Sequence, residues 1–328
     1  MNKNRFSEWF SNTRAFNAIG GPCFNLLEKF LGYPILKIRF KRRTGYKLNL
    51  KDPTSFNEKI NLKKVKDRNP LLTVVADKHR VRGYIADIIG QEKADEICIP
   101  HLHVTDDPRT IPFDELPDEY VIKTNHRSGA NLIVEKDHFV DRRAIIRNFT
   151  NQLKIPYACF KHEWGYLNIP RKVLIEPLIR DEEGRLPVDY KLHMISGRCV
   201  MIHVHHGLCD DWDNQTCTVF DRDWVRQDVF WNHPPRDHVP RPDGLDEMIA
   251  IAEALARPLD MVRVDFFSMN GRLYFGEMTN YPYSGFSKVS PRDYELYIGS
   301  LWNQHAEGYS DNPSACMSEM DGVNGRTS

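Results

Sequence analysis

The chain has 328 residues, of which 41% are hydrophobic and 11% aromatic, so it can bury a sizeable core and form more than one lobe. Its 45 basic and 45 acidic residues balance, which excludes the global positive field that draws proteins to nucleic acids. Seven scattered cysteines without a C-x-x-C pair exclude a disulfide framework and a zinc knuckle, and predict reduced thiols.

No apolar run approaches the roughly 20 residues needed to span a bilayer, and no signal-peptide pattern is present. The sequence therefore predicts a cytoplasmic protein. Residues 1–50 are rich in aromatic and basic side chains, which leaves two interpretations open. The segment packs as an arm against its own domain, or residues 1–45 make a peripheral contact with the inner face of the membrane.

The stretch after this arm is predicted to be helical. Ser55 and Glu58 have the capping-box spacing that begins a helix. From Leu71 to Ile89 apolar residues recur at helical intervals, which predicts a single helix that ends at Gly90. Charged residues fall within this helix, where a solvated face explains them as well as a functional one does.

After Pro100 the pattern changes to α/β. Residues 116–126 read as a loop and a strand that carries Lys123, and residues 131–134 read as the returning strand. The small-residue turn between them contains Ser128, Gly129 and Ala130. A lysine followed by such a turn can hold phosphate, because the ammonium supplies charge and the backbone N–H groups close over the anion. The turn is not a Walker loop.

A second group of strands follows. Residues 172–179 predict a strand that runs into a proline, and residues 188–206 predict a hairpin around a Ser-Gly turn. Strand alternation places Asp189 and Lys191 on one face of that hairpin. A helix is expected over residues 245–256.

The last hairpin carries the strongest signal. Two mostly apolar runs are joined by an Asn-Gly turn at residues 270–271. Alternation puts Arg263 and Asp265 on one face, and the second strand returns toward that end of the sheet. The polar residues of this second strand are Glu277, Thr279 and Asn280. Such a set suits Mg²⁺ shared with a phosphate, and the alternative is a surface hairpin whose charges face water.

Three histidines near residue 205 look like a metal cluster. His203 and His205 are alternate residues of a predicted strand, and His206 points to the opposite side. With no third ligand evident, we interpret them as strand histidines that line a cleft rather than as a zinc site.

Six short phrases occur along the chain in an informative order. They read TSFNEKIN at 54–61, DRNP at 67–70, ADK at 76–78, VIKTNH at 121–126, DYK at 189–191 and FGEMT at 275–279. Together they resemble the ATP-grasp superfamily of carboxylate–amine ligases, and most closely its TupA-like branch, which is linked to teichuronopeptide and capsular polysaccharide synthesis. The resemblance implies an α+β fold in which two lobes with antiparallel sheets hold ATP between them, behind an N-terminal helical arm.

This fold implies five regions. They are an aromatic and basic arm over residues 1–50, a helical cap over 51–115, a small lobe with the phosphate loop over 116–171, a large lobe with the Mg²⁺ site over 172–305, and a flexible tail over 306–328.

The resemblance also implies a reaction. ATP and Mg²⁺ activate a carboxylate as an acyl phosphate, an amine attacks it to form an amide, and ADP is released. The implied substrates are a uronic-acid-containing surface polysaccharide or its precursor and an amino acid or amine, with no nucleic acid involved.

Carried over by position, the nucleotide contacts lie in both lobes. The resemblance implies that Lys123 contacts the α and β phosphates while the small-residue turn covers them. Glu176 and the backbone through Leu178 are implied to form the adenine hinge. Asp189 faces the ribose or orients Lys191 onto the phosphates.

The catalytic and metal residues implied by the resemblance lie on the last hairpin. Asp265 and Glu277 are the implied Mg²⁺ ligands, and Arg263 would stabilise the acyl phosphate and the tetrahedral intermediate. Many ATP-grasp enzymes have Asn where this chain has Thr279. The third ligand is therefore Thr279, Asn280 or water.

Acceptor contacts are expected beside these groups. His126 and Arg127 could bind an anionic acceptor. Tyr283 and Ser284 follow the metal strand, where an aromatic residue suits stacking on a sugar ring, although turn packing explains it equally well.

Two alternative functions have weaker support in the sequence. A glycosyltransferase of polysaccharide biosynthesis would need a nucleotide-sugar site, for which residues 210–213 are the nearest metal-binding candidate. A catalytically silent ATP-binding scaffold is disfavoured because the cations and carboxylates of the implied site are all present.

Overall fold

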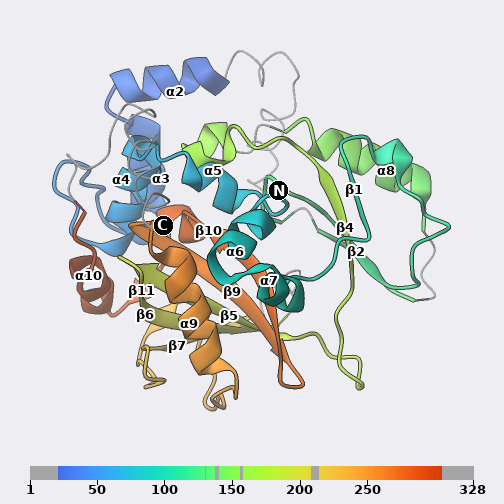
Figure 1. Ribbon diagram of the computed structural model, residues 1–328. Helices are drawn as coiled ribbons and strands as arrows, with labels where there is room; N and C mark the ends of the chain where they lie inside the picture. Colours follow the sequence, from blue (N-terminus) through green and yellow to red (C-terminus); the bar gives the residue numbers. More distant parts are fainter. Residues whose placement is uncertain (1–20, 130, 137–139, 156–157, 208–213, 305–328) are drawn as a thin grey trace, which may run out of the picture.

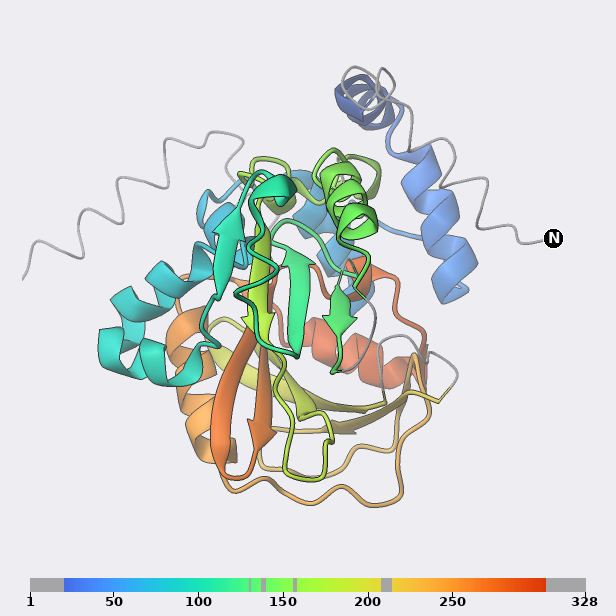
Figure 2. The ribbon, with the colours of Figure 1, turned by 90° about the vertical axis from the view of Figure 1, so that its right-hand side faces the viewer.

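The computed structural model describes residues 21–129, 131–136, 140–155, 158–207 and 214–304 (Figure 1). It is an α+β structure with two main antiparallel sheets. In Figure 2 the green strands of the smaller sheet stand above the yellow and orange strands of the larger one. The start of the predicted arm, Ala130, residues 210–213 and the predicted tail lie outside the described residues.

The smaller sheet has the strand order β1-β4-β2-β3. Its strands are β1 (His103–Thr105), β2 (Tyr120–Thr124), β3 (Leu132–Val134) and β4 (Val173–Pro177). Helix α8 (Arg142–Gln152) packs on one face, where Ile145 and Phe149 join Ile122 and Val173 in a buried cluster. The strand and returning strand expected around Lys123 are therefore confirmed as β2 and β3.

The predicted boundary between the lobes at residue 171 is wrong. Strand β4 pairs with β2 from Tyr120–Pro177 to Thr124–Val173, and with β1 on its other side, so it belongs to the smaller sheet. Hydrogen bonds to distant strands decide sheet membership, and the apolar run of β4 contains no information about its partners.

The larger sheet has the order β10-β9-β5-β6-β7. Its strands are β5 (Val188–Ile195), β6 (Arg198–His206), β7 (Thr216–Phe220), β9 (Met261–Met269) and β10 (Arg272–Thr279). Both predicted hairpins are confirmed, since φ is positive at Ser196 and Gly197 and again at Asn270 and Gly271. Positive φ at both central residues matches the right-handed twist of the flanking strands.

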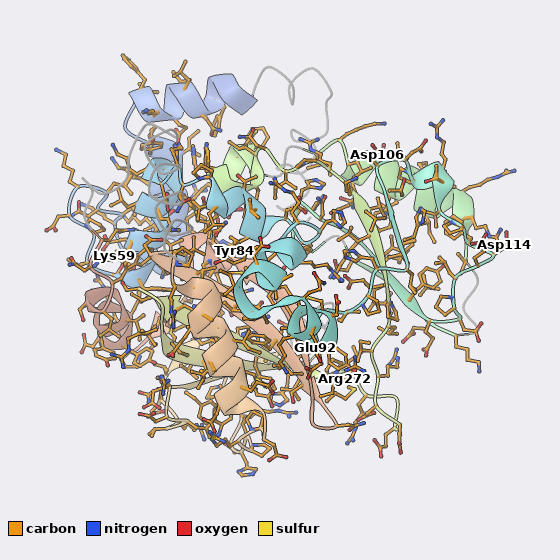
Figure 3. All side chains as sticks on the ribbon, viewed as in Figure 1. Lys59, Tyr84, Glu92, Asp106, Asp114 and Arg272 are labelled. Carbon is orange, nitrogen blue, oxygen red and sulfur yellow. The ribbon has the colours of Figure 1, made fainter. Side chains whose placement is uncertain are left out.

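One face of this sheet, here called the outer face, is apolar. Helix α9 (Leu245–Ala256) lies on it as predicted, together with α6 (Val81–Ile89) and α7 (Gln91–Ile97). The Tyr84 hydroxyl of α6, labelled in Figure 3, donates to the Leu255 carbonyl of α9 at 2.6 Å. The opposite, inner face of the sheet carries the polar groups described below.

The single helix predicted between Leu71 and Ile89 is wrong. The chain forms α5 (Leu71–Ala76) and α6, with a break at Asp77. The Asp77 Oδ1 accepts the His79 backbone N–H at 2.9 Å, so the side chain satisfies a backbone donor that the break exposes. The predicted end at Gly90 is correct, where φ is 87°.

Helix α4 (Phe56–Lys66) joins the N-terminal region to the larger sheet. The capping box is confirmed, because the Glu58 N–H donates to Ser55 Oγ at 3.3 Å and the Ser55 N–H donates back to Glu58 at 3.1 Å. Lys59, labelled in Figure 3, donates to the Trp302 carbonyl at 2.5 Å. Helix α10 (Arg292–Ser300) approaches so closely that a Cβ at Gly299 would lie 2.2 Å from the Thr54 carbonyl oxygen.

The described part of the arm is helical. Helix α3 (Pro34–Thr44) buries Leu36 and Phe40 against α4, so this part packs on its own domain. Helix α2 (Gly21–Phe30) lies at the periphery in both views (Figures 1 and 2). The remaining short strands β8 (Phe230–Trp231) and β11 (Val289–Ser290) pair with each other.

Candidate active site

Arg263, Asp265 and Glu277 form an ionic cluster on the inner face. Asp265 and Glu277 are directly opposed on β9 and β10. The Arg263 guanidinium donates to both oxygens of Asp265 at 2.6 Å and to Glu277 Oε1 at 3.2 Å. Bidentate pairing of this kind holds the groups in one orientation. The predicted placement of these residues on one face is confirmed.

Strand β5 adds Lys191 and Asp189 to the cluster. The Lys191 Nζ lies 3.2 Å from Asp265 Oδ2 and also donates to Asp189. Burial by itself would lower the pKa of Lys191, but the carboxylates of Asp189 and Asp265 raise it above its ordinary value. Lys191 is therefore charged at neutral pH, and Asp189 orients it.

Lys78 joins the ionic cluster, although the sequence pattern fits a solvated helix face as well as a functional one at this position. Its Nζ lies 2.7 Å from Glu277 Oε2 in the large lobe and 3.4 Å from the Arg127 carbonyl beside the small-residue turn. The break at Asp77 brings it there. Burial would raise the pKa of Glu277, but Lys78 and Arg263 hold it well below its usual range. In the sequence, the sign that Lys78 could belong to the site was its place in the phrase ADK at residues 76–78, one of the six that carry the family resemblance.

Asn125 fixes the turn beside Lys78. It is fully buried, and its side-chain amide donates to Asp77 Oδ1 and to the Pro170 carbonyl, each at 2.8 Å. Its Oδ1 accepts the Lys172 N–H at 2.7 Å. Asn125 and Asp77 therefore tie the helix break to the end of β2, and with it the Lys78 ammonium.

The cluster is balanced in charge. Three carboxylates face three cations, namely Asp189, Asp265 and Glu277 against Lys78, Lys191 and Arg263. Buried charges are tolerated only when they are paired, and removing one partner leaves the other uncompensated. Carboxylate oxygens on two opposed strands are also hard ligands of the kind Mg²⁺ prefers, so the donor set fits that ion.

Thr279 and Asn280, the two residues predicted as candidates for a third Mg²⁺ ligand, lie in different places. The Thr279 hydroxyl donates to Glu277 Oε1 at 2.9 Å and accepts from Arg263 at 3.1 Å, so it lies within the cluster. The Asn280 amide instead donates to the Leu72 carbonyl of α5 at 2.7 Å. This contact directs the Asn280 side chain toward α5, just beyond the end of β10, which argues against Asn280 as a metal ligand.

In the smaller sheet, Lys123 pairs with Glu176 on the neighbouring strand. Their Nζ and Oε2 atoms are 2.5 Å apart, while Arg82 and His101 each lie 3.3 Å from Oε1. Burial would raise the pKa of Glu176, but Lys123 and His101 lower it to about 2. Leu178, which was predicted to form the adenine hinge with Glu176, follows the end of β4 and is half-buried.

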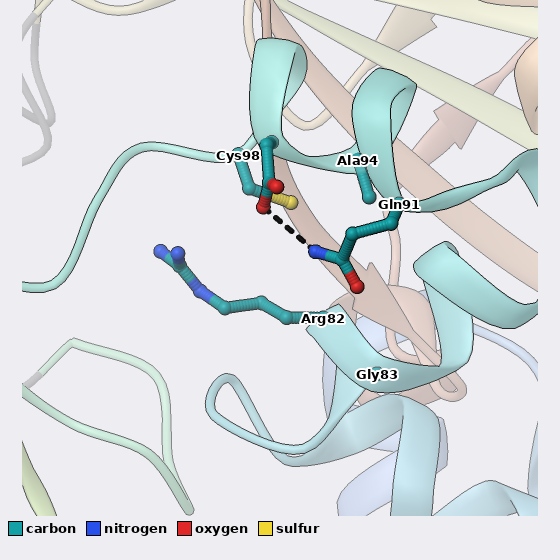
Figure 4. Close-up of a pocket in the computed structure, with 6 residues that line it drawn as sticks. Arg82, Gly83, Gln91, Ala94 and Cys98 are labelled. Carbon is teal, nitrogen blue, oxygen red and sulfur yellow. Dashed lines mark hydrogen bonds between the residues drawn. The ribbon is translucent and has the colours of Figure 1, made fainter.

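A small cavity of about 130 Å³ lies beside Arg82, between α6 and α7 (Figure 4). Arg82, Gln91 and Cys98 line it, and Gln91 donates to Asp95 at 2.8 Å. Ligand pockets usually measure about 300–1,000 Å³, so this cavity is too small to be a nucleotide site.

The predicted phosphate turn and the predicted acceptor residues beside it lie in different surroundings. Of the phosphate turn, Ser128 and Gly129 are exposed, and the φ of Gly129 is 71°. His126 is buried, and burial lowers its pKa to about 3, so it offers no positive charge to an anion. Arg127 bonds Gln152 of α8.

Tyr283 and Ser284 face different neighbours. The Tyr283 ring centroid lies 5.8 Å from the Arg263 guanidinium carbon, so the ring borders the ionic cluster. The Ser284 carbonyl accepts from the buried Lys64 of α4 at 2.9 Å. Of the two, Tyr283 is the one positioned beside the cluster.

Comparison with solved structures gives only distant likenesses. A D-alanine–D-alanine ligase from Bacillus anthracis is 16% identical over 63% of this chain, with a TM-score of 0.37, and this chain covers 57% of that ligase. The corresponding Helicobacter pylori ligase is 13% identical, with 76% and 69% of the two chains covered and a TM-score of 0.40. An N5-carboxyaminoimidazole ribonucleotide synthetase from Thermus thermophilus is 12% identical, with 63% and 45% covered and a TM-score of 0.34.

No curated protein sequence matches the chain. A family model described as TupA-like ATP-grasp matches residues 58–303, which include most of α4, both main sheets and every residue of the ionic cluster. The chain therefore belongs to the TupA-like ATP-grasp family.

Proposed function

We propose that this protein is an ATP- and Mg²⁺-dependent ligase that joins a carboxylate to an amine. The observation that carries the proposal is the position of Lys78, which contacts Glu277 of the large lobe and the Arg127 carbonyl of the small lobe. The predicted metal site and the predicted phosphate turn thus converge on one ammonium. Family membership gives the fold in which such a junction holds a nucleotide.

Asp265 and Glu277 would hold the magnesium ion, with Thr279 beside them. The ion would neutralise phosphate charge and polarise the phosphoryl group. Lys78, Lys191 and Arg263 now neutralise the same carboxylates. With those carboxylates occupied by a metal, the three cations become available to phosphate oxygens, which supplies the positive charge that phosphoryl transfer requires.

Lys123 and the small-residue turn would hold the α and β phosphates. Because the Glu176 carboxylate already accepts from Lys123 and Arg82, we assign adenine contact to the backbone near Leu178 rather than to that side chain. In the reaction, a substrate carboxylate oxygen attacks the γ-phosphorus and ADP leaves. The amine then attacks the acyl carbon, phosphate leaves, and the amine nitrogen loses a proton.

The acceptor in this proposal is a uronic acid of a surface polysaccharide or of its precursor. Tyr283 supports a sugar site, because its ring borders Arg263 next to the proposed acyl phosphate. The glycosyltransferase alternative rests on residues 210–213, which lie outside the described residues, and no observation favours it.

We further propose a cytoplasmic location with peripheral membrane contact through residues 1–45. Apolar side chains on α2 and α3 are exposed, with Phe30 at 87% and Ile38 at 53%, and the last turn of α3 carries Lys41, Arg42 and Arg43. Within the described residues, no helix combines the length and apolar character needed to cross a bilayer. Phe30→Glu should abolish co-sedimentation with anionic phospholipid vesicles, and a wild-type protein that fails to sediment contradicts this contact.

The ligase proposal is tested by release of ADP and phosphate from Mg-ATP. Uronic acids and uronate oligosaccharides are crossed with amino acids and amines. We expect release that requires both substrates, and a product whose mass is that of acid plus amine minus water. Calorimetry with Mg-ATP is the parallel measurement, and a protein that binds no ATP overturns the proposal.

A further inference from the structure

A second polar cluster continues the inner face toward its β7 edge. It consists of His203 and His205 on β6 and Cys217 on β7. One nitrogen of each imidazole and the Cys217 sulfur all lie within 4.8 Å of one another. The sequence could not indicate the cysteine as a third ligand, because it is on a different strand.

Strand register explains why these three side chains meet. His205 is directly opposite Cys217, so the two share one face of the sheet. His203 is two residues away on the same strand and therefore points the same way. On the other side of β6, His203 lies opposite Lys191, which places the cluster next to the ionic cluster on the same face.

The buried imidazole of His203 lacks a protein partner in the described part of the chain. It is fully buried, and neither of its ring nitrogens has a hydrogen bond there. Its neighbours are aromatic, with the Trp231 ring centroid at 4.8 Å. Leaving a buried polar group unsatisfied costs about 1–3 kcal/mol, so this arrangement calls for a ligand.

His205 has the supporting contact that a metal ligand needs. The Tyr283 hydroxyl lies 2.9 Å from His205 Nε2. A ligating histidine commonly uses one ring nitrogen for the ion and donates the other N–H to an oxygen, which fixes the orientation of the ring. His205 is also half-buried, unlike His203 and Cys217, so the cluster opens on this side.

We propose that His203, His205 and Cys217 bind one divalent transition-metal ion of the zinc class, with a fourth position left open beside His205. Two imidazoles and a thiolate select such an ion, whereas the oxygen ligands of Asp265 and Glu277 select Mg²⁺. Zn–N bonds of about 2.0–2.1 Å and Zn–S bonds of about 2.3 Å are within reach of small side-chain rotations from the present spacing. The inner face would thus hold two metal ions, Mg²⁺ at the carboxylates and a zinc-class ion at the imidazoles and the thiolate, because each ligand set prefers a different ion. The inference is independent of the ligase proposal.

The test uses the full-length protein, stripped of metal with a chelator and titrated with Co²⁺. We expect one equivalent to bind, with a thiolate-to-cobalt charge-transfer band in the near ultraviolet, and Zn²⁺ to displace it. Cys217→Ser should abolish the band, and His203→Asn should weaken binding by more than about 100-fold, since loss of an outer contact alone costs about 10- to 100-fold. Tyr283→Phe removes only the outer contact to His205, so it should weaken Co²⁺ binding by about 10- to 100-fold.

Cys199→Ser is the matched control, because Cys199 is also a buried cysteine of the larger sheet but lies on β6 and packs in the outer-face core. Its variant should bind Co²⁺ as wild type does. X-ray absorption of the zinc-loaded wild-type protein keeps the proposal testable if a variant fails to fold. One sulfur and at least two nitrogen ligands are expected. A zinc shell without sulfur, or a cobalt band that survives in Cys217→Ser, overturns the proposal.

Discussion

The two faces of the larger sheet are built from the same strands but differ in chemistry, because the inner face carries charged groups beside a second apolar cluster that packs on α4 and α10. The outer face presents Leu192, Val264 and Phe266 to α9 and α6, and all three are fully buried. The inner face presents Lys191 and Asp265 from the neighbouring positions. Alternation along each strand thus divides the sheet into a face for stability and a face for chemistry.

The inner face is nevertheless almost as well buried as the outer one. Arg263 is 7% exposed and Asp265 is 3% exposed. Burying a charge is costly unless it is paired, so the inner face is stable only as a complete set of opposite charges. The comparison predicts that substitutions on the outer face change stability alone, whereas those on the inner face change activity as well as stability.

The largest effect is expected on the outer face. Phe266→Ala removes a fully buried ring and should lower the free energy of unfolding by about 3–5 kcal/mol. Urea unfolding measures this loss. The specific activity of the folded fraction should stay at the wild-type level, and an activity loss at temperatures where the variant is folded would break the division between the faces.

On the inner face, Glu277→Gln should reduce ligase turnover by about 10²- to 10³-fold, because it removes a proposed metal ligand and part of the preorganised charge. Circular dichroism should show a retained fold, since the side chain keeps its shape. Glu92→Gln on α7 is the control, because Glu92 is exposed (Figure 3) and its loss should leave turnover unchanged. Normal turnover in Glu277→Gln removes Glu277 from the site.

The Lys123–Glu176 pair extends the comparison to the smaller sheet. The pKa of Glu176 is lowered from 4.5 to about 2, so its stabilising contribution is complete above pH 4.5 and is lost as the pH falls toward 2. We expect the wild type to lose on the order of 2–3 kcal/mol more than Glu176→Gln over this range. Urea unfolding midpoints at several pH values measure this difference in stability. If the wild type and Glu176→Gln lose stability in parallel as the pH falls, the Lys123–Glu176 pair is not the source of the stabilisation.

The smallest effect is expected at the contact between the lobes. Lys78→Met removes the ammonium but keeps the length of the side chain. A hydrogen bond to a charged group is worth about 1.5–3 kcal/mol, so we expect weaker Mg-ATP binding by roughly 10- to 100-fold. Calorimetry measures the affinity for Mg-ATP. Lys66→Met is the control, because Lys66 is exposed. Unchanged affinity in Lys78→Met would mean that Lys78 only stabilises the interface.

Local chemistry accounts for the parts that could be predicted from sequence. The capping box at Ser55, the turn at Asn270 and helix α9 each depend on residues that are neighbours in the chain. The break at Asp77 was missed because the apolar periodicity continues across it. It becomes necessary only when Asn125 and Glu277 bind the residues at the break.

The sequence by itself determined the family, the strand alternation and the residue types of the candidate site. Those properties follow from order and spacing along the chain. The tertiary structure alone decided that β4 joins the smaller sheet, that Lys78 reaches Glu277, and that Cys217 lies opposite His205. Each of these contacts joins segments that are distant in sequence, and strand pairing and helix packing set such distances rather than any local pattern.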